Sequence, residues 1–304
     1  MRIGVDLGGT KTEVIALDNT GAERYRRRVA TPAGDYAASL QTIRELVLET
    51  ERETGETGSV GVAIPGALSA ATGRIKNANS TWLIGRALDA DLAALLERPV
   101  RVMNDANCFA VSEAADGAGA GARVVFGVIV GTGTGGGIVV DGRPLVGANA
   151  IAGEWGHNPL PWPRPEELPG PACYCGKAGC IETWLSGPGL AADHLAQTGE
   201  TCSAEEVAER AGKADAAARA TLARHADRMA RALASVINLL DPEVIVLGGG
   251  LSNLAHLYTE VPARWGDYVF SDRVDTRLVP PRHGDSSGVR GAAWLWPRDT
   301  LHQG

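Results

Sequence analysis

Short runs of β-forming residues alternate with turn residues over residues 2–29 of the chain. Such runs, bounded by glycine and asparagine, are typical of β-strands. Three such runs predict strands over residues 2–6, 12–17 and 23–29, and the turn residues between them predict a meander. A glycine-threonine corner, Gly8-Gly9-Thr10, separates the first strand from the second.

A helical period replaces this alternation after Pro32. Tyr36, Leu40, Ile43 and Val47 recur three and four residues apart, so they fall on one face of a helix. The remainder of the first half alternates between strands and helices. We expect a strand at 59–64, a helix at 88–96, a strand at 100–103 and a helix from about 105 to 115.

The second part of the chain repeats the opening pattern. A strand at 123–130, a glycine-threonine corner and a strand at 136–140 come first; an apolar stripe of helical spacing at 222–240 and a strand at 244–247 come later. The repetition predicts a duplicated α/β unit with a cleft between the copies. We expect domains over residues 1–115 and 116–304, with a terminal helix near 291–296 as a candidate to pack back on the first domain.

Composition excludes several classes of protein. The chain has 304 residues, 44% hydrophobic and 21% charged, which is ordinary for a soluble globular protein. It contains no apolar run near the roughly 18 residues of a membrane span. Its first residues, MRIGVDLGGT, lack the apolar segment of a secretion signal, so we expect a cytoplasmic protein. The net charge of −7 has the wrong sign for a nucleic-acid partner.

The first glycine-threonine corner has the composition of a phosphate-binding turn. Gly8 and Gly9 lack side chains that would keep a phosphate from backbone N–H groups, and Thr10 and Lys11 add a hydroxyl and a charge. Asp6, at the end of the preceding strand, is a candidate to hold Mg²⁺ through water. The alternative is a plain hairpin that needs glycine for positive φ. The spacing is not that of a Walker P-loop.

The second corner strengthens the phosphate hypothesis because it matches the first. Two such corners, one on each side of a cleft, could clamp the β- and γ-phosphates of ATP. The residues of this second corner with a predicted phosphate role are Thr132, Gly133, Thr134 and Gly135.

Asn104 and Asp105 lie where a strand meets a helix. One interpretation is structural: Asp105 caps the helix N-terminus. The other is catalytic: a carboxylate at a strand end accepts the proton of a substrate hydroxyl during phosphoryl transfer, and the helix N-terminus keeps it ionised. Asn104 could then orient the same substrate.

A cluster of thiols predicts a metal site. His157, Cys173, Cys175 and Cys180 form a complete Cys₃His set, and four protein ligands are typical of a structural rather than a catalytic zinc. Chance clustering is the weaker alternative.

Two acidic residues flank the predicted zinc ligands. Glu154 and Glu182 are candidates to accept sugar hydroxyls, although each could equally be a surface charge. The second ring nitrogen of His157 is free for a neighbouring acceptor or for a ligand hydroxyl.

The motifs resemble, in order, those of the ROK family of bacterial sugar kinases. They are DLGGTK (6–11), NDAN (104–107), IVGTGTG (129–135), GEWGH (153–157), CYCGKAGCIE (173–182) and VLGGG (246–250). The resemblance spans nearly the whole chain. It implies the duplicated actin-like, hexokinase-like (ribonuclease H-like) ATPase fold of class α/β, with ATP, Mg²⁺ and a structural Zn²⁺ as cofactors.

The resemblance also implies roles for individual residues. Asp105 is the catalytic base, and Gly248, Gly249 and Gly250 lie near adenosine. The implied sugar contacts are Asn79, Asn104, Asp105, Glu154, His157 and Glu182. Homodimers are common in the family, but the sequence does not fix an oligomeric state.

Within the family, the segments KNANSTWL, GHNPLPW and HGDSSGVRGAAWLW look closest to bacterial fructokinases of the mannofructokinase type. We therefore expect fructose as the substrate. N-acetylglucosamine kinases and glucokinases of the same family are the alternatives, although we expect GEFGH rather than GEWGH, and no STWL segment, in the former. A transcriptional repressor or a silent sugar sensor is the alternative of another class.

Overall fold

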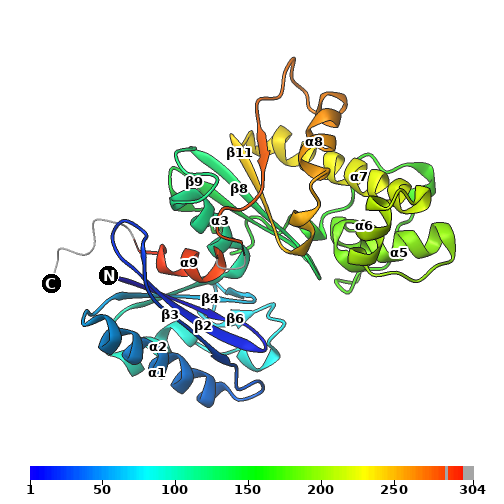
Figure 1. Ribbon diagram of the computed structural model, residues 1–304. Helices are drawn as coiled ribbons and strands as arrows, with labels where there is room; N and C mark the ends of the chain where they lie inside the picture. Colours follow the sequence, from blue (N-terminus) through cyan, green and yellow to red (C-terminus); the bar gives the residue numbers. More distant parts are fainter. Residues whose placement is uncertain (285–286, 297–304) are drawn as a thin grey trace. The chain divides into compact units, whose positions relative to one another are not determined.

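The computed structural model describes residues 1–284 and 287–296, and the chain divides into two compact units (Figure 1). Unit 1 comprises Met1–Gly121, Gly137–Ala152 and the segment from Arg282 onward; unit 2 comprises Ala122–Gly136 and Gly153–Pro281. The sequence predicted a single boundary after residue 115. The chain instead leaves unit 1 and re-enters it twice, because a hairpin and the last helix both belong to the first unit.

A five-stranded mixed sheet forms the centre of unit 1. Its order is β3-β2-β1-β4-β7. The first three strands pair antiparallel, as the predicted meander requires, whereas β4 and β7 join parallel to β1. The bounds are β1 Arg2–Leu7, β2 Lys11–Leu17, β3 Glu23–Ala30, β4 Ser59–Ile64 and β7 Val100–Asn104.

Helices cover the two faces of this sheet differently. Helices α1 (Tyr36–Thr54) and α2 (Leu88–Leu96) lie on one face and bury the main apolar core, as Figure 1 shows. Helix α9 (Ser287–Ala293) lies against β1 and β4, where Gly4 and Gly61 lack side chains. A Cβ at Gly4 would stand 2.1 Å from the carbonyl oxygen of Val289, so the helix backbone packs directly on the strand.

The second sheet repeats the strand order of the first. It runs β10-β9-β8-β11-β12, which is again third, second, first, fourth and fifth in sequence. Strand β11 pairs parallel with the first strand, β8, and β12 pairs parallel with β11. The duplication predicted from the sequence is therefore confirmed by topology. The bounds are β8 Val124–Val130, β9 Thr134–Val140, β10 Arg143–Pro144, β11 Val244–Gly248 and β12 Arg277–Val279.

Helices make up most of the remainder of unit 2. The longest is α7, Ala216–Leu240, whose predicted apolar stripe is buried at Met229, Leu233 and Ile237. The others are α4 Ile181–Leu185, α5 Gly187–Thr198, α6 Ala204–Gly212 and α8 Leu257–Glu260. The described part of the chain contains no helix with the length and apolarity needed to cross a bilayer.

Short elements complete the structure. Strand β9 begins at Thr134, two residues earlier than predicted, because the corner before it is tighter than its glycine content suggested. Helix α9 begins at Ser287 rather than near 291, and Gly291 packs against the Cys108 carbonyl of α3 (Asp105–Ala115). The minor strands are β5 Ala67–Leu68 and β6 Ile75–Lys76, and the 3₁₀ turns are Thr81–Leu83, Trp155–His157, Pro165–Glu167, Gly250–Asn253 and Pro262–Asp267.

Candidate active site

The Gly8 corner of unit 1 is closed by its own hydrogen bonds. Gly8 donates its N–H to the Lys11 carbonyl at 3.0 Å, so this N–H is already used within the turn. A Cβ at Gly8 would stand 2.9 Å from the same carbonyl oxygen, and this close approach explains the glycine. Neither Gly8 nor Gly9 has positive φ, so the hairpin explanation based on positive φ is wrong.

At position 9 of this corner, no packing contact requires a glycine. Gly9 is exposed, and a Cβ there would meet only the Ser80 hydroxyl, at 3.6 Å. Thr10 and Lys11 are exposed beside it. The open face of the corner is therefore Gly9 to Lys11. Ser80, which the sequence did not single out, joins it from the loop before the Thr81–Leu83 turn, next to the exposed Asn79.

Two carboxylates of unit 1 influence each other. Burial, together with the negative charges of Asp105 and Glu13 and against the opposing charge of Arg28, raises the pKa of Asp6 to about 7. Asp6 ends the buried strand β1, and Asp105 begins α3. A cation bound beside Asp6 would favour its ionised form, so the charge environment of Asp6 fits a metal-associated role.

The helix cap is Asn104 rather than Asp105. The Asn104 side chain accepts from the Ala106 N–H at 2.9 Å, and its amide donates to the Gly66 carbonyl at 3.1 Å. The prediction of Asp105 as the cap is wrong because Asp105 is already the first helical residue, although its Oδ1 also accepts from Ala106 at 2.8 Å. The helix therefore retains its cap without the Asp105 charge.

The second corner, in unit 2, is tied to the zinc-ligand region. Gly131 donates to the Gly133 carbonyl at 2.9 Å, and the Thr134 N–H donates to the Glu182 carboxylate at 2.8 Å. A Cβ at Gly133 would stand 2.8 Å from that carboxylate. Glu182 therefore lies directly on the phosphate corner, a contact that its sequence position two residues after Cys180 did not indicate.

The GEWGH segment also packs on this corner. The Trp155 indole N–H donates to the Gly135 carbonyl at 2.9 Å, and its ring meets Phe126 edge-on. A Cβ at Gly156 would stand 2.1 Å from the Thr134 carbonyl oxygen. The buried Trp155 is thus a packing residue of the corner. Glu154 beside it is exposed.

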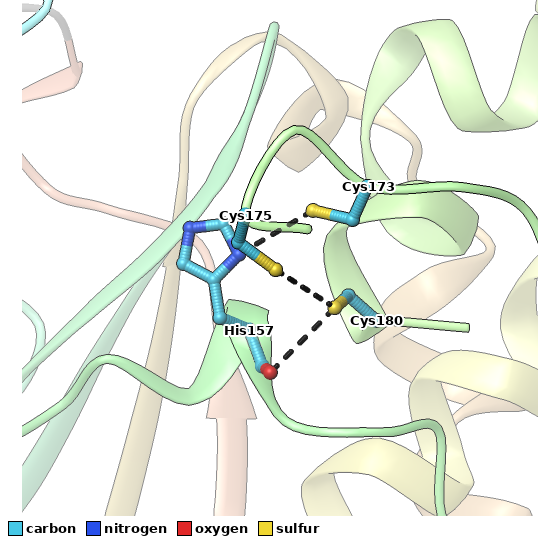
Figure 2. Close-up of side chains that lie close together, drawn as sticks. All are labelled: His157, Cys173, Cys175 and Cys180. Atoms are coloured by element: carbon cyan, nitrogen blue, oxygen red, sulfur yellow. Dashed lines mark hydrogen bonds between the residues drawn. The ribbon is translucent and has the colours of Figure 1, made fainter. Parts of the chain in front are cut away.

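The four predicted zinc ligands lie together (Figure 2). Nδ1 of His157 is 3.6 Å from the Cys173 sulfur, and the Cys175 and Cys180 sulfurs are 3.6 Å apart. A tetrahedral zinc with Zn–S of about 2.3 Å and Zn–N of about 2.0 Å separates its ligand atoms by about 3.6–3.8 Å. These two spacings and the donor types fit Zn²⁺.

Protonation of the cluster is uneven in the metal-free chain. Burial raises the pKa of the Cys180 thiol to about 12, whereas a backbone hydrogen bond from Lys177 lowers the pKa of Cys175. A bound zinc would supply the positive charge that favours all three thiolates.

The second nitrogen of His157 faces a tyrosine. Nε2 lies 3.0 Å from the Tyr174 hydroxyl, and the two rings meet edge-on. Tyr174 is 80% exposed, so the contact lies at the surface of the loop. Burial and the negative charges of Glu182, Cys173 and Glu154 raise the pKa of Tyr174.

A cavity of about 420 Å³ adjoins the second corner. Thr132 and Gly250, both predicted to hold the nucleotide, line it. Gly249 directly precedes Gly250 and adopts φ +79. A Cβ at Gly249 would clash with the Val130 carbonyl oxygen at 2.4 Å. The lining residues that the sequence analysis missed are Gly131, Gly187, Pro188, Ala191, Ser203, Ala204, Glu205 and Leu251.

One sequence signal could have pointed to the missed wall. The stretch Ser186-Gly187-Pro188 has the composition of a helix start, and Ser186 does cap α5. Gly187 donates to the Gly131 carbonyl at 2.8 Å, which brings the positive end of the α5 dipole to the corner. A helix N-terminus beside a glycine turn is a favourable place for a phosphate.

Comparison with known proteins identifies the family. Residues 2–299 match the ROK family. The chain belongs to the ROK family. It is 39% identical over 299 residues to an N-acetyl-D-glucosamine kinase of Yersinia enterocolitica, covering 97% of this chain and 99% of the relative.

Solved structures of the same family match the fold. A ROK hexokinase of Thermus thermophilus is 30% identical, with a TM-score of 0.86 and 97% of both chains covered. A ROK family glucokinase of Streptomyces griseus, solved with glucose and AMPPNP, is 26% identical, with a TM-score of 0.76 and coverage of 97% and 98%. The actin-like α/β fold implied by the motifs is therefore confirmed.

Proposed function

We propose that this ROK family protein is an ATP-dependent sugar kinase that phosphorylates N-acetyl-D-glucosamine. Kinase activity on a sugar is the part with broad support, since it is named in the curated relatives and in the solved hexokinase and glucokinase. The main support for this function is the hydrogen bond from the Thr134 N–H to Glu182. It connects the proposed phosphate corner with the loop that carries the proposed sugar contacts.

Asp105 is assigned as the general base. Transfer of a phosphoryl group to a sugar hydroxyl requires an acceptor for the hydroxyl proton, and a carboxylate at a helix N-terminus supplies one. Asn104 performs the capping that the helix needs, so Asp105 is not required for that structural task. This division of labour supports a chemical role for the carboxylate.

The nucleotide is assigned to the corners and the 420 Å³ cavity. The cavity is lined by Thr132 and Gly250, has the N-terminus of α5 at its edge, and is large enough for adenosine. The open corner at Gly9 offers backbone to phosphate in unit 1. Mg²⁺ is assigned to the region of Asp6 because a divalent cation neutralises charge between phosphate oxygens and favours that carboxylate in its ionised form.

Zinc is assigned to His157, Cys173, Cys175 and Cys180 as a structural ion. Its chemistry there is to order the loop, because four protein ligands leave no coordination position open. The loop then carries Glu154 and Glu182 as acceptors for sugar hydroxyls. Tyr174 lies at the free nitrogen of His157, so a sugar hydroxyl that uses that nitrogen must share or displace this hydroxyl.

The sugar assignment departs from the fructose expectation. That expectation relied on the segments KNANSTWL, GHNPLPW and HGDSSGVRGAAWLW and on Trp155. Packing accounts for Trp155, which is buried against Phe126, and for Trp82, which packs against the core of unit 1, whereas Trp162 of the second segment is exposed. The full-length relative is named an N-acetyl-D-glucosamine kinase, which favours the alternative that the motifs left open.

A sugar panel tests the assignment. ADP release is measured with ATP and Mg²⁺ against N-acetylglucosamine, glucose, mannose and fructose. We expect kcat/KM for N-acetylglucosamine to exceed that for fructose at least tenfold, because one unpaired group in a desolvated site costs about 1–3 kcal/mol. A tenfold preference for fructose would restore the fructokinase assignment and leave the kinase assignment intact.

A further inference from the structure

The 420 Å³ cavity of unit 2 has a negative charge in its wall. Among the described residues that line it, Glu205 alone is charged, and it stands in the first turn of α6. The other polar side chains of the wall are the hydroxyls of Thr132 and Ser203. A carboxylate repels phosphate, so the phosphates assigned to this region do not explain why Glu205 faces the cavity.

Two helices of unlike charge begin at this cavity. A Cβ at Gly187, the first residue of α5, would stand 3.8 Å from the Cβ of Ala204, the first residue of α6. The first turn of α5 contains no acidic residue, whereas that of α6 contains Glu205 and Glu206. The positive end of a helix dipole favours a bound anion less where carboxylates already stand. Phosphate is therefore favoured at the start of α5 and disfavoured at the start of α6.

The two glutamates of α6 differ in what they contact. Glu206 completes a capping box: its carboxylate accepts from the Ser203 N–H at 2.7 Å, and its own N–H donates to the Ser203 hydroxyl at 3.1 Å. Glu205 is exposed, lines the cavity and forms no hydrogen bond or ion pair within the described part of the chain. Its carboxylate is therefore an available acceptor at the mouth of the cavity.

Small apolar side chains supply much of the remaining wall. They belong to Pro188 and Ala191 of α5, Ala204 of α6 and Leu251. Such a surface suits the faces of a heterocyclic base, but these side chains offer no hydrogen-bond partner to a hydroxyl group. The hydroxyls of a bound nucleoside must therefore find their partners at the few polar positions of the wall.

We propose that Glu205 accepts hydrogen bonds from the ribose hydroxyls of the nucleotide and thereby selects a ribonucleotide as the phosphoryl donor. This inference rests on the assignment of ATP to the cavity under the proposed function. A carboxylate is acceptor-only, which matches the O–H donors of ribose, and acidic residues hold ribose hydroxyls in the same way in dinucleotide-binding folds. The contact also explains the sign of the charge, because the sugar end of a nucleotide is uncharged.

The exposure of Glu205 sets the size of the expected effect. A hydrogen bond to a charged group contributes more than one between neutral groups. Water still reaches an exposed carboxylate when a deoxynucleotide binds, so the loss is smaller than in a sealed site, where the unpaired group would stay desolvated. We therefore expect discrimination against a deoxynucleotide of about tenfold.

Calorimetric titration with three nucleotides tests the proposal. The purified full-length protein is titrated in Mg²⁺ buffer with ADP, 2′-deoxy-ADP and 3′-deoxy-ADP. We expect the wild-type protein to bind ADP about tenfold more tightly than at least one deoxy analogue. Glu205→Ala should weaken ADP binding to the level of that analogue and leave the analogue's own Kd unchanged. In the kinase assay the same variant should raise KM for ATP with kcat unchanged, because the ribose is not a reacting group.

Glu206→Gln is the matched control. It removes the same charge from the same helical turn, retains the capping box and should leave all three dissociation constants unchanged. Equal binding of ADP and both analogues by the wild-type protein, or an equal weakening of all three by Glu205→Ala, would overturn the ribose contact and leave the kinase assignment intact. Absence of ADP binding would overturn both. Ribose discrimination without sugar phosphorylation would support the contact and contradict the kinase alone.

Discussion

At the residue scale, the carboxylates of unit 1 separate structural from chemical tasks. The sequence allowed two interpretations of Asp105: a catalytic base, which the family resemblance implied, or the helix cap, because an aspartate after a strand is a common cap. The side chain of Asn104 performs that task, a distinction that depends on one hydrogen bond and so could not be predicted from residue types. The raised pKa of Asp6 likewise depends on burial and on the approach of Asp105.

Replacing the proposed base tests its role. Asp105→Asn removes the proton acceptor but retains the size of the side chain and a group that can accept from the Ala106 N–H. We expect kcat to fall by about 10²–10⁴ with little change in melting temperature. Asn104→Ala is the matched comparison for stability, because loss of the cap should cost about 1 kcal/mol. An Asp105→Asn enzyme within a few-fold of wild-type kcat would remove the base assignment.

The charge on Asp6 destabilises the folded protein to an extent that depends on pH. Its folded pKa of about 7 lies above the ordinary value of 3.8, so between these values the folded chain binds the proton and the unfolded chain releases it. The stability from this group is present at low pH and is lost as pH rises through about 7.

The neutral variant Asp6→Asn should therefore stabilise the protein most strongly in alkaline solution. In metal-free and nucleotide-free buffer, we expect a higher melting temperature at pH 8, by about 2–4 °C per kcal/mol recovered, and a smaller difference at pH 5. Asp267→Asn, at an exposed carboxylate of unit 2, is the control. An equal loss of stability at both pH values would contradict the raised pKa.

At the element scale, strands and long helices could be predicted, whereas loops with chemical roles could not. The short β-rich runs predicted β1 to β4 and β8 closely, because the turn residues that bound such runs mark where a strand begins and ends. The short helices α4 and α6 and the 3₁₀ turn at Trp155–His157 carry few periods from which to recognise them. The residues that the sequence missed in the proposed nucleotide cavity lie mainly in or beside these elements.

The Gly9 corner offers a clean test of phosphate binding. Gly9→Val should fold normally, because a Cβ there meets only the Ser80 hydroxyl at 3.6 Å, but its side chain would occupy the open face. We expect a raised KM for ATP or loss of turnover, measured by ADP release. Gly266→Val, another glycine with room for a side chain, is the matched control. Unchanged ATP kinetics in Gly9→Val would show that the corner is only a turn.

The zinc loop should contribute to the binding of ATP as well as of the sugar. Cys175→Ser should lose zinc, lower the melting temperature and raise KM for the sugar, and also raise KM for ATP, because Glu182 and Gly156 hold the second corner. Tyr174→Phe, in the same loop but without a ligand atom for zinc, should retain the metal. Normal ATP and sugar kinetics in a zinc-free Cys175→Ser protein would separate the loop from the site.

At the scale of the whole molecule, the sequence predicted the duplicated α/β unit but not the full division of the chain between the two units. Both sheets follow one strand order because both halves begin with the same strand, corner and strand. Helix α9 belongs to unit 1 through contacts such as Gly291 with Cys108, and the sequence offered a terminal helix near 291–296 as a candidate for this position. The hairpin at Gly137–Ala152 also belongs to unit 1, which local patterns did not indicate because they contain no record of contacts between residues distant in sequence.

The identity of the sugar also belongs to the whole molecule. Motifs suggested fructose in part from segments around Trp82 and Trp155, which pack within the protein, whereas similarity along 97% of the chain favours N-acetylglucosamine. A few residues at a binding-site wall can redirect specificity among sugars, and short motifs do not isolate them.

The most direct test of the account is sugar-dependent phosphoryl transfer by the wild-type protein. Purified protein is incubated with ATP, Mg²⁺ and N-acetylglucosamine, and ADP and the sugar phosphate are quantified in the same samples. The account predicts equal amounts of the two products, no appreciable ADP without sugar, and loss of both in Asp105→Asn. Tight binding of the sugar with no phosphorylated product would instead identify a sensor and contradict the proposed kinase.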